Sequence, residues 1–552
     1  MPRQSHVAPV SERVRTQEPH RSEEFRAGVQ ESLDIIAAAI VALGFFLRLW
    51  RAQATFFSTD EAWHFALANQ NSLAAAYKAS LTLLHPPLLL VILYYWRHLG
   101  TSNLVLRLPS VIAGTLLCWA VYRWLSGVFS PSVGWMGLLF TTFLPPLIAL
   151  SAELRQYTLM MLFAVGSAYL LEKALATGSD GRMIGSCLCL YLAMVSHYSA
   201  FLFAAALGGY CIVRMIRDRP QGGVIAAWSA GQVIGIALGY FFYVTHISKL
   251  GGVNTRAQPI HNYADWYLSE WYFHPGRDHV LPFLYRGTIG IFRFTFGQTA
   301  VGQIATVLYI FGVLLLVLQK PVSRRWPPRS TAVLLLLPFV LNWAAVAAGL
   351  YPYGRTRQCV YLALFAIAGV SAALAIISAG HMKVATLLAL GMIIVCHARG
   401  TLEGRDMLPL AEQRQGNMDQ AIQFIRKEVA PKDLILTDMA TSFQLRHYLC
   451  DQMPVKIERN SRGYESFQCS GIRISSTGPD EGALTADAVD KQWVTYESGA
   501  DSQLVWVVQG GWASGLGEEL RRSCPAFAQT EVHSFGRYLE VFRLPPPTLT
   551  IP

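Results

Sequence analysis

The chain has 552 residues, of which 53% are hydrophobic and 14% charged. A soluble globular protein carries about 25% charged residues. This composition therefore excludes a single soluble domain and a fibrous or disordered chain, and it predicts a polytopic membrane protein. The net charge of +10 is typical of a membrane protein whose cytoplasmic loops are rich in lysine and arginine. The sequence has no basic stretch interleaved with aromatic residues, which is the pattern expected of a nucleic-acid-binding protein.

The N-terminal segment is polar. Residues 1–33 contain five arginines and precede an apolar run that ends at Arg48 without a signal-peptidase site. We therefore expect residues 1–33 to form a disordered cytoplasmic tail and the following run to be an uncleaved membrane anchor. Arg48 stands at the end of this first span and is expected to extend its guanidinium to the membrane surface.

Uncharged runs predict about 11 transmembrane helices within residues 34–398, where roughly 20 residues are needed to cross the hydrocarbon core. The run 183–213 is too long for one span. We read it as two spans that turn near His197, because this reading keeps the basic short loops on one side. The segment 86–96 is too short to cross and predicts an interfacial or re-entrant helix. The spans are expected at 35–50, 108–122, 133–152, 156–171, 183–213 (two), 223–244, 299–318, 331–350, 359–380 and 384–398.

The basic loops place the N-terminus in the cytoplasm, and an odd number of spans then places the C-terminus outside, on the periplasmic or lumenal face of the cell membrane. Three large segments are expected on that face: the first loop 51–107, an aromatic-rich loop 245–298 and the segment 399–552. In the aromatic loop, Trp271 either lies at the membrane interface, which we favour, or stacks on a sugar.

The segment 399–552 alternates predicted helices and strands, which favours an external α/β domain built as a small three-layer sandwich. Helices are predicted at 411–429, 441–449 and 517–522, and strands or extended segments at 433–438, 454–458, 503–509, 529–534 and 537–544. Three cysteines, Cys450, Cys469 and Cys524, allow at most one internal disulfide in an oxidising environment. Our guess for that pair is Cys469–Cys524.

Ionisable residues gather at the outer ends of the predicted spans. They are Asp60-Glu61, His85 before two prolines, Arg107, Glu153 with Arg155 and Tyr157, His197, and the pair Arg355 and Arg357. Each residue alone also fits a solvated loop, a packing role or an interfacial anchor. Arg107 is a candidate counter-ion for Glu61, and two guanidiniums at a membrane surface suit a lipid-linked phosphate. The expected position of all these residues at the same face of the membrane is better evidence for a functional site than any single residue.

The ordered set of motifs resembles a known family. Asp60-Glu61, His85-Pro86-Pro87-Leu88, Leu106-Arg107 with Gly114, Glu153-Leu154-Arg155-Gln156-Tyr157 and Ser196-His197-Tyr198 are similar to motifs of the GT-C membrane glycosyltransferases, which include the protein O-mannosyltransferases and the aminoarabinose transferases of lipid A. The similarity covers about residues 34–210. It is weak over 211–399, apart from the segment with Arg355 and Arg357, and mostly topological in the tail.

The resemblance implies a mainly α, GT-C-like transmembrane catalytic domain over residues 34–398. It implies a glycosyltransferase that moves a hexose or pentose from a polyprenyl-phosphate donor, by a single inverting displacement, to an acceptor on the outer face. Asp60 would be the general base, and Glu61 would pair with Arg107 or help to hold a cation. Substrate-binding residues would be His85, Glu153, Arg155, Tyr157, His197, Arg355 and Arg357.

Cofactor and acceptor stay open at this point. A divalent cation held by Asp60, Glu61 and Glu153 is one alternative, and no cofactor is the other. The acceptor is a glycan, a lipid or a protein, and the lumenal sugar-recognition insert of the protein mannosyltransferases is absent from this sequence. Two other function classes also remain, a transporter or flippase and a non-catalytic polysaccharide assembly factor. A transporter would place ionisable residues in mid-span and show paired broken helices.

Overall fold

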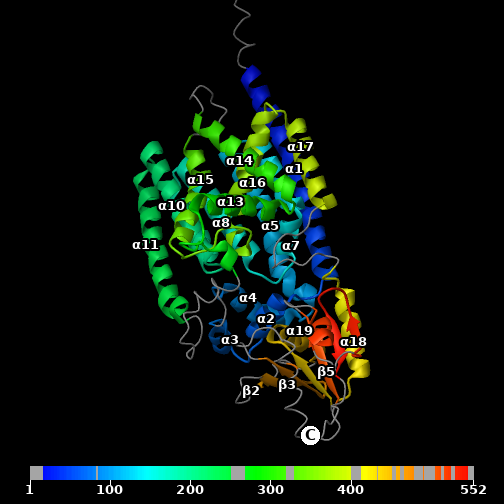
Figure 1. The fold of residues 1–552 in the computed structure, drawn as a ribbon. Helices are drawn as coiled ribbons and strands as arrows, with labels where there is room; N and C mark the ends of the chain where they lie inside the picture. The colour runs from blue at the N-terminus through cyan, green and yellow to red at the C-terminus, as the bar shows by residue number, and fades with distance from the viewer. Residues whose placement is uncertain are drawn as a thin grey trace, which may run out of the picture.

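The computed structural model describes residues 17–81, 85–249, 268–318, 329–399, 412–431, 433–450, 456–459, 465–477, 489, 504–510, 515–523 and 529–544. A long helical bundle forms one end of the molecule, and a small α/β domain forms the other, with three short helices between them (Figure 1). The predicted architecture, a mainly α polytopic protein with a C-terminal extramembrane α/β domain, is confirmed.

The bundle contains helices of 7 to 38 residues. They are α1 (Gln17–Ala54), α5 (Asn103–Val128), α6 (Pro131–Phe143), α7 (Pro145–Ser151), α8 (Tyr157–Thr177), α9 (Asp180–Met194), α10 (Ser199–Asp218), α11 (Gly222–Thr245), α13 (Val280–Phe296), α14 (Thr299–Leu318), α15 (Ser330–Ala347), α16 (Leu362–Ile377) and α17 (Met382–Arg399). Among the described residues, seven helices are long and apolar enough to cross a membrane, or eight if the bent pair α6–α7 is one span.

Each predicted span coincides with a helix or with that bent pair, and the predicted turn near His197 falls in the break between α9 and α10. Two expectations are corrected. The helix α1 begins at Gln17, inside the segment expected to be disordered, because a helix once formed by the apolar span propagates easily through Glu, Gln, Arg and Ala. The helix α13 lies in the expected outer loop, where the sequence analysis placed no helix.

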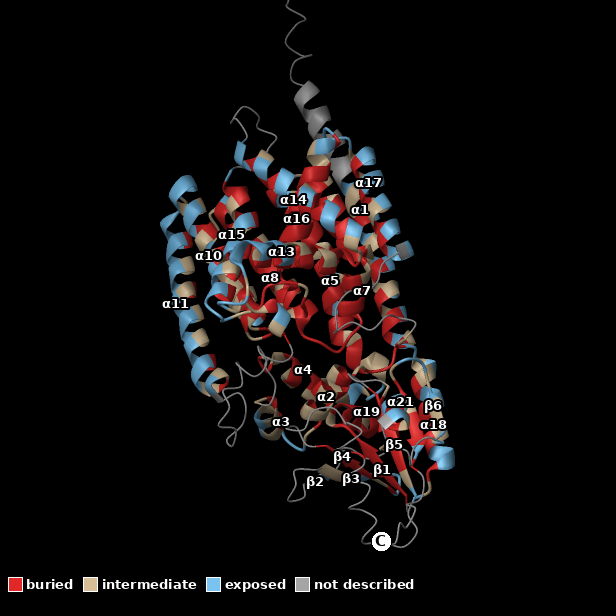
Figure 2. Cartoon of the chain, in the orientation of Figure 1, coloured by how far each residue is buried: buried red, intermediate tan, exposed pale blue. Residues whose placement is uncertain are grey.

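The bundle carries an exposed apolar surface that fits lipid. On α11 the side chains of Val233, Ile234, Ile236 and Tyr240 are 55–74% exposed, and Figure 2 shows this helix mainly in the exposed and intermediate colours. The interior of the bundle is a continuous apolar core from α5 to α17. An exposed apolar face of this extent is unusual in a soluble monomer and is consistent with a membrane environment.

The break between α6 and α7 gives Arg48 a structural role. The two helices meet at 63°, where Pro145 and Pro146 lack the N–H groups that would bond the carbonyls of Thr141 and Thr142. The Arg48 guanidinium donates to both carbonyl oxygens, at 2.7 and 3.3 Å, and is 1% exposed. The expectation that Arg48 reaches the membrane surface is therefore wrong, because the broken helix offers it acceptors inside the bundle.

Three short helices connect the bundle to the α/β domain: α2 (Thr59–Ala68), α3 (Leu73–Ser80) and α4 (Leu88–Trp96), the last continued by the 3₁₀ turn η1 (Arg97–Leu99). The helix α4 has nine residues, too few to cross a membrane, as its sequence predicts. In Figure 1 these helices lie at the end of the bundle that faces the α/β domain.

The C-terminal domain is a mixed sheet with helices on both faces. The strands are β1 (Leu434–Thr437), β2 (Glu458–Arg459), β3 (Glu465–Cys469), β4 (Ile472–Ser476), β5 (Val505–Gln509), β6 (Val532–Ser534) and β7 (Glu540–Arg543), in the order β2-β3-β4-β1-β5-β7-β6. The central strand β1 is parallel to β4 and β5, and the remaining pairs are antiparallel. The helices are α18 (Gln415–Glu428), α19 (Met439–Leu449) and α21 (Leu516–Ser523).

Alternation along β1 separates the two faces of this sheet. Ile435 packs with α18 and α19, whereas Leu434 and Leu436 pack with Leu516 and Leu520 of α21. This is the predicted three-layer arrangement. The sequence analysis missed β3 and β4. The hairpin that they form places Cys469 beside the end of α19, where it is bonded to Cys450, so the guessed pair Cys469–Cys524 is wrong. Cys524 lies outside the described residues.

Candidate active site

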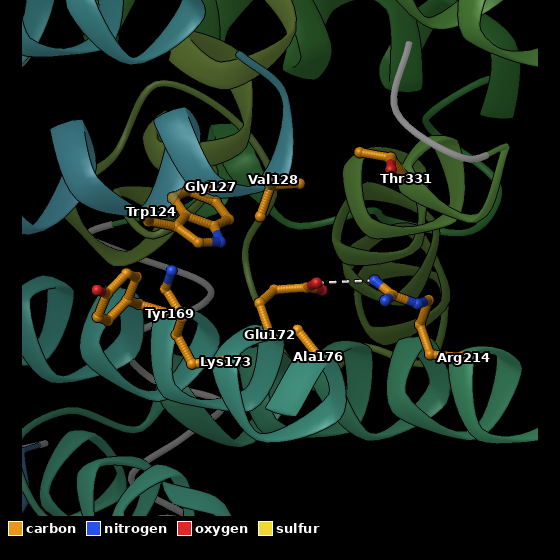
Figure 3. Close-up of a pocket in the computed structure, with 9 residues that line it drawn as sticks. All are labelled: Trp124, Gly127, Val128, Tyr169, Glu172, Lys173, Ala176, Arg214 and Thr331. Carbon is orange, nitrogen blue, oxygen red and sulfur yellow. Dashed lines mark hydrogen bonds and ion pairs between the residues drawn. The ribbon is translucent and has the colours of Figure 1, made fainter. Parts of the chain in front are cut away.

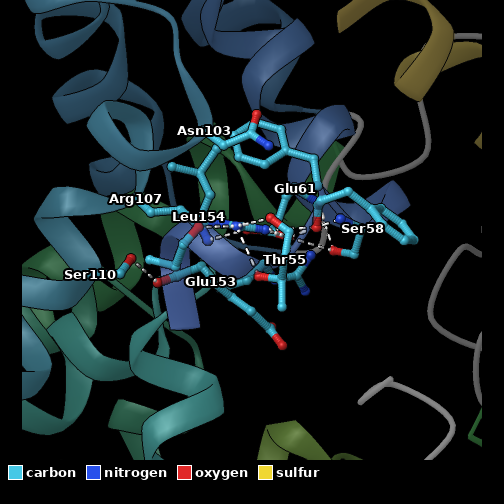
Figure 4. A network of polar contacts seen from close by, with 12 residues as sticks. Thr55, Ser58, Glu61, Asn103, Arg107, Ser110, Glu153 and Leu154 are labelled. Carbon is cyan, nitrogen blue, oxygen red and sulfur yellow. Dashed lines mark hydrogen bonds and ion pairs between the residues drawn. The ribbon is translucent and has the colours of Figure 1, made fainter. Parts of the chain in front are cut away.

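Glu61 and Arg107 form a fully buried ion pair near the start of α5. Arg107 Nε and Nη2 donate to the two carboxylate oxygens of Glu61 at 2.6 and 2.7 Å, and both side chains are 0% exposed. Arg107 also donates to the carbonyls of Ala52, Thr55 and Phe56. Figure 4 shows this network between α2 and α5. The predicted pairing of Glu61 with Arg107 is present.

The start of α2 explains why two adjacent carboxylates face different partners. Ser58 caps the helix, and the Glu61 side chain accepts from the Ser58 N–H at 2.9 Å, which is a capping box. Glu61 accepts as well from the backbone N–H of Leu154, at 2.8 Å. This fixes Glu61 inward, and Asp60, about 100° further round the helix, points elsewhere.

Asp60 lies between two guanidiniums. Its Oδ2 is 3.1 Å from Arg155 Nη1 and 3.3 Å from Arg357 Nη1, and its side chain remains 18% exposed. Burial raises the pKa of Asp60, but the charges of Arg155 and Arg357 outweigh this effect and hold the pKa below its usual value. Asp60 is therefore an ionised carboxylate in contact with two cations, and it is the more accessible carboxylate of the adjacent pair.

Glu153 is the third acid of the cluster. It stands in the connection between α7 and α8, and its Oε2 is 3.3 Å from Arg357 Nη2. Burial raises the pKa of Glu153, and the neighbouring arginines only partly oppose that rise, so the pKa lies above its usual value. The bend at Pro145-Pro146 directs the end of α7 toward this position.

Three histidines and a tyrosine line the other side of Arg155. The ring centroids of His64 and His85 are 5.8 Å apart, and those of His85 and His197 are 5.3 Å apart. Tyr157 lies against His197 at 5.2 Å and accepts from Arg155 Nη2 at 3.2 Å. Burial and the Arg155 charge lower the pKa of His64 and His197 to about 3 and that of His85 well below its usual value. These imidazoles are neutral at pH 7.

The cluster has a surplus of positive charge and unused hydrogen-bonding atoms. Its three carboxylates face four guanidiniums, those of Arg51, Arg107, Arg155 and Arg357, where Arg51 interacts electrostatically with Glu153 and Glu61. Among the described residues, the buried Nε atoms of Arg155 and Arg357, Nε2 of His64 and Nδ1 of His85 have no hydrogen-bond partner. The two guanidinium Nε–H groups are buried donors without partners, and at a positive site they suit an anionic oxygen ligand. Nε2 of His64 is an acceptor, because the ring is neutral and its Nδ1 carries the proton that bonds the Asp60 carbonyl.

The chain is similar to known proteins both in sequence and in fold. The sequence matches the model of the family described as "Dolichyl-phosphate-mannose-protein mannosyltransferase" over residues 84–237. ArnT from Cupriavidus metallidurans, solved with bound undecaprenyl phosphate, is similar with a TM-score of 0.51 at 13% identity, over 93% of this chain and 99% of that one. The chain has the GT-C fold.

Other solved structures match less well. The Archaeoglobus fulgidus oligosaccharyltransferase in its apo form gives a TM-score of 0.46 at 10% identity, over 86% of this chain and 69% of that one. The same enzyme with an inhibitory peptide and a dolichol-phosphate gives 0.41 at 11% identity, over 75% and 63%. A search of curated proteins found no match.

A divalent cation does not fit the candidate site as it stands. Asp60 contacts two guanidiniums, Glu61 is saturated by Arg107 and two backbone N–H groups, and Glu153 faces Arg357. Within the described ranges, no group of three or more His, Cys, Asp and Glu side chains could hold a metal ion. We therefore derive no step through a metal.

The site residues predicted from the sequence come together with one exception. The structure gathers Asp60, Glu61, His85, Arg107, Glu153, Arg155, Tyr157, His197 and Arg357. Arg355 instead lies over the ring of Trp271, with its guanidinium carbon 6.0 Å from the ring centroid. Trp271 is only 8% exposed and its carbonyl accepts from Tyr353 N–H, so it packs inside the protein.

Sequence reasoning missed two members of the cluster. His64 Nδ1–H donates to the Asp60 carbonyl at 2.7 Å, and this nitrogen lies 3.4 Å from Arg155 Nη1. Its signal was the spacing of four residues from Asp60, which places both on one face of a helix. Arg51 is 9% exposed at the end of α1, and its position beside Trp50 at a span end resembles an ordinary interfacial anchor.

Proposed function

We propose that this chain is a membrane glycosyltransferase that transfers a sugar from a polyprenyl-phosphate donor to an acceptor hydroxyl at the outer face of the membrane. The observation that carries the proposal is the contact of one accessible carboxylate, Asp60, with two buried guanidiniums that retain unused donors. The family match and the GT-C fold support it, since the matched family is described by a dolichyl-phosphate donor and ArnT was solved with undecaprenyl phosphate.

The proposed reaction is one inverting displacement. Asp60 takes the proton of the acceptor hydroxyl while its oxygen forms a bond to the anomeric carbon. The bond from that carbon to the phosphate oxygen breaks, and the leaving polyprenyl phosphate gains a negative charge. Arg155 and Arg357 stabilise this charge with their free N–H groups. Glu61, saturated by Arg107, holds the start of α2 in place.

The same geometry would couple donor binding to the basicity of Asp60. Without a donor phosphate, the charges of both guanidiniums keep the pKa of Asp60 low, and Asp60 is a weak base. A phosphate placed against Arg155 and Arg357 adds negative charge beside Asp60, which raises the pKa of the carboxyl. Asp60 would then be a stronger base when the donor is bound.

The test compares Asp60→Asn with a matched surface variant, Asp419→Asn, in cells that lack the endogenous gene. Asp419 is exposed on α18. General-base assistance is worth about 10²–10⁴ in rate, so transfer should fall by at least about 100-fold in Asp60→Asn and stay unchanged in the control. Mass spectrometry of surface glycans and lipids measures the product. Near-normal product from Asp60→Asn would contradict the proposal.

A further inference from the structure

A second buried site lies at the end of the bundle opposite to the candidate active site. It is a cavity of about 200 Å³, which is larger than a single water molecule needs. The ends of α5, α8 and α10 and the start of α15 enclose it, and Figure 3 shows its walls. Its lining consists of Trp124, Gly127, Val128, Tyr169, Glu172, Lys173, Ala176, Arg214 and Thr331.

The one carboxylate in this lining is already neutralised. Glu172 accepts from Arg214 Nη1 at 2.7 Å and from the Tyr210 hydroxyl at 2.5 Å, one bond to each oxygen. Arg214 is itself held in place by Asp218, at 2.6 Å. Glu172 therefore has no charge to offer a cationic ligand.

The remaining polar groups of the cavity can all donate: the Trp124 N–H and the Lys173 ammonium only donate, and the hydroxyls of Tyr169 and Thr331 donate as well as accept. Among the described residues, Trp124 Nε1 and Thr331 Oγ1 have no hydrogen-bond partner, although their side chains are 1% and 0% exposed. Figure 3 shows the indole nitrogen of Trp124 and the amine of Lys173 on the same side of the cavity. Lys173 has no carboxylate within ion-pair distance in the described part of the chain, and its amine lies 5.7 Å from the Tyr169 ring centroid.

The cavity and the ion pairs at its edge carry one surplus positive charge. Arg214 and Arg217 are matched by Glu172 and Asp218, and the charge of Lys173 is left over. Unused donors and one surplus cation match a ligand with acceptor oxygens and a single negative charge. The location adds a constraint, because span ends lie at the depth of lipid headgroups. We propose that this cavity binds the phosphodiester of an anionic phospholipid, independently of the proposed glycosyl transfer.

The neutralised Glu172 also sets a preference among lipids. A phosphodiester with an attached ammonium or choline brings a positive charge that this cavity cannot pair. A headgroup without that charge, such as phosphatidylglycerol, leaves the single negative charge to face Lys173. We therefore expect phosphatidylglycerol to bind more tightly than phosphatidylcholine.

The experiment measures lipid binding to the purified full-length protein. Delipidated protein in detergent is titrated with phosphatidylglycerol, phosphatidylcholine or inorganic phosphate, and binding is read by native mass spectrometry and by the rise in melting temperature. The variants are Lys173→Gln and Trp124→Phe. Matched controls are Lys383→Gln, an exposed lysine at the start of α17, and Trp135→Phe, whose N–H donates to Thr386 instead.

Phosphatidylglycerol should bind wild type and both controls equally, and about fivefold more weakly to Lys173→Gln, as expected for loss of one basic contact to an anionic lipid. Trp124→Phe, which keeps an aromatic ring and loses only the donor, should also weaken binding. Equal binding of both lipids, or unchanged affinity in both cavity variants, would overturn the proposal. Stabilisation by inorganic phosphate that needs Lys173, with no added effect of phosphatidylglycerol, would overturn the assignment to a lipid.

Discussion

At the scale of single residues, two adjacent carboxylates have opposite environments. Glu61 is fully buried and accepts bonds from Arg107, Ser58 and Leu154, whereas Asp60 is 18% exposed between Arg155 and Arg357. The capping geometry at the start of α2 causes this division, because it turns one carboxylate back onto the helix end and leaves the other outside. Substitution of Glu61 and substitution of Asp60 should therefore have different effects on the stability and the activity of the protein.

Glu61→Gln should destabilise the protein. The amide cannot neutralise Arg107, and removing one partner of a buried ion pair costs about 3–5 kcal/mol. Asp60→Asn should change stability much less, since its side chain is partly exposed. Unfolding of the purified variants in detergent, followed by tryptophan fluorescence, measures the difference. If Glu61→Gln and Asp60→Asn unfold alike, the structural role of Glu61 is wrong.

The pH dependence of transfer should report on the arginines beside Asp60. The base is the deprotonated form, so activity is present above the pKa of Asp60 and is lost as the pH falls through it. Because that pKa lies below its usual value, kcat/KM should stay level down to about pH 4, the ordinary carboxyl range. Arg357→Gln removes one of the two cations and should move the acid limb to higher pH.

Arg277→Gln is the matched control for this profile, since Arg277 is exposed and pairs with Asp278 away from the cluster. Its acid limb should coincide with that of wild type. If the acid limb of Arg357→Gln also coincides with that of wild type, Arg357 does not lower the pKa of Asp60.

At the scale of elements, the proline break directs the connection that carries Glu153 and Arg155. The bend of 63° between α6 and α7 leaves two carbonyls without helical donors, and Arg48 supplies them. Gly114 on α5 allows the close approach of α7, because a Cβ at that position would lie 2.2 Å from Ser151 Oγ. One buried arginine thus stabilises the break on which part of the candidate site depends.

Arg48→Met should therefore destabilise the bundle. Each buried carbonyl left without a donor costs about 1–3 kcal/mol, so the loss should be a few kcal/mol. Adding Pro145→Ala and Pro146→Ala restores two N–H donors and should recover part of that loss, although the bend and activity change. Unfolding in detergent measures all three proteins. If the losses of stability caused by the arginine and proline substitutions simply add, Arg48 does not act by bonding the carbonyls that the prolines leave free.

The α/β domain also contacts the helix that carries Asp60. The Tyr448 hydroxyl on α19 accepts from Phe57 N–H at 2.6 Å, and Gln444 donates to the Phe57 carbonyl at 2.9 Å. Trp63 of α2 stacks on Phe443 at 5.7 Å. The segment before Asp60 is thus held between the bundle and the tail domain.

At the scale of the whole molecule, the buried charges of the candidate site lie at one end of the bundle, beside α2 and the tail domain (Figure 1). A transporter would instead need ionisable residues near the middle of its spans. The placement favours a reaction at one membrane surface, and the basic loops predict that this surface is the outer one.

Reporter fusions test that orientation. The basic segment after α10 predicts that Pro220 is cytoplasmic, whereas a fusion at Gly400 should be external. An alkaline phosphatase reporter should be active only at Gly400, and a cytoplasmic fluorescent reporter only at Pro220. If both sites report the same side, the number of spans between them is not odd and the orientation of the candidate site is wrong.

The sequence by itself predicted the membrane class of the protein, the positions of its apolar helices and most residues of the candidate site. Long uncharged runs have no alternative to membrane helices, and the scarcity of charge made Asp60, Glu61 and Arg107 visible as candidates. Alternating elements in the tail likewise predicted a layered α/β domain, because hydrophobic periodicity is a local property.

Tertiary structure alone decided which partner each of these residues meets. Arg48 turned inward because prolines on another helix freed two carbonyls, Arg355 turned to Trp271, and Cys469 met Cys450 through a hairpin that the sequence analysis missed. Contacts between residues far apart in the sequence, such as Arg48 with Thr142 and Asp60 with Arg357, depend on how the helices pack. Such packing is a property of the whole fold and leaves no periodic signal in the sequence.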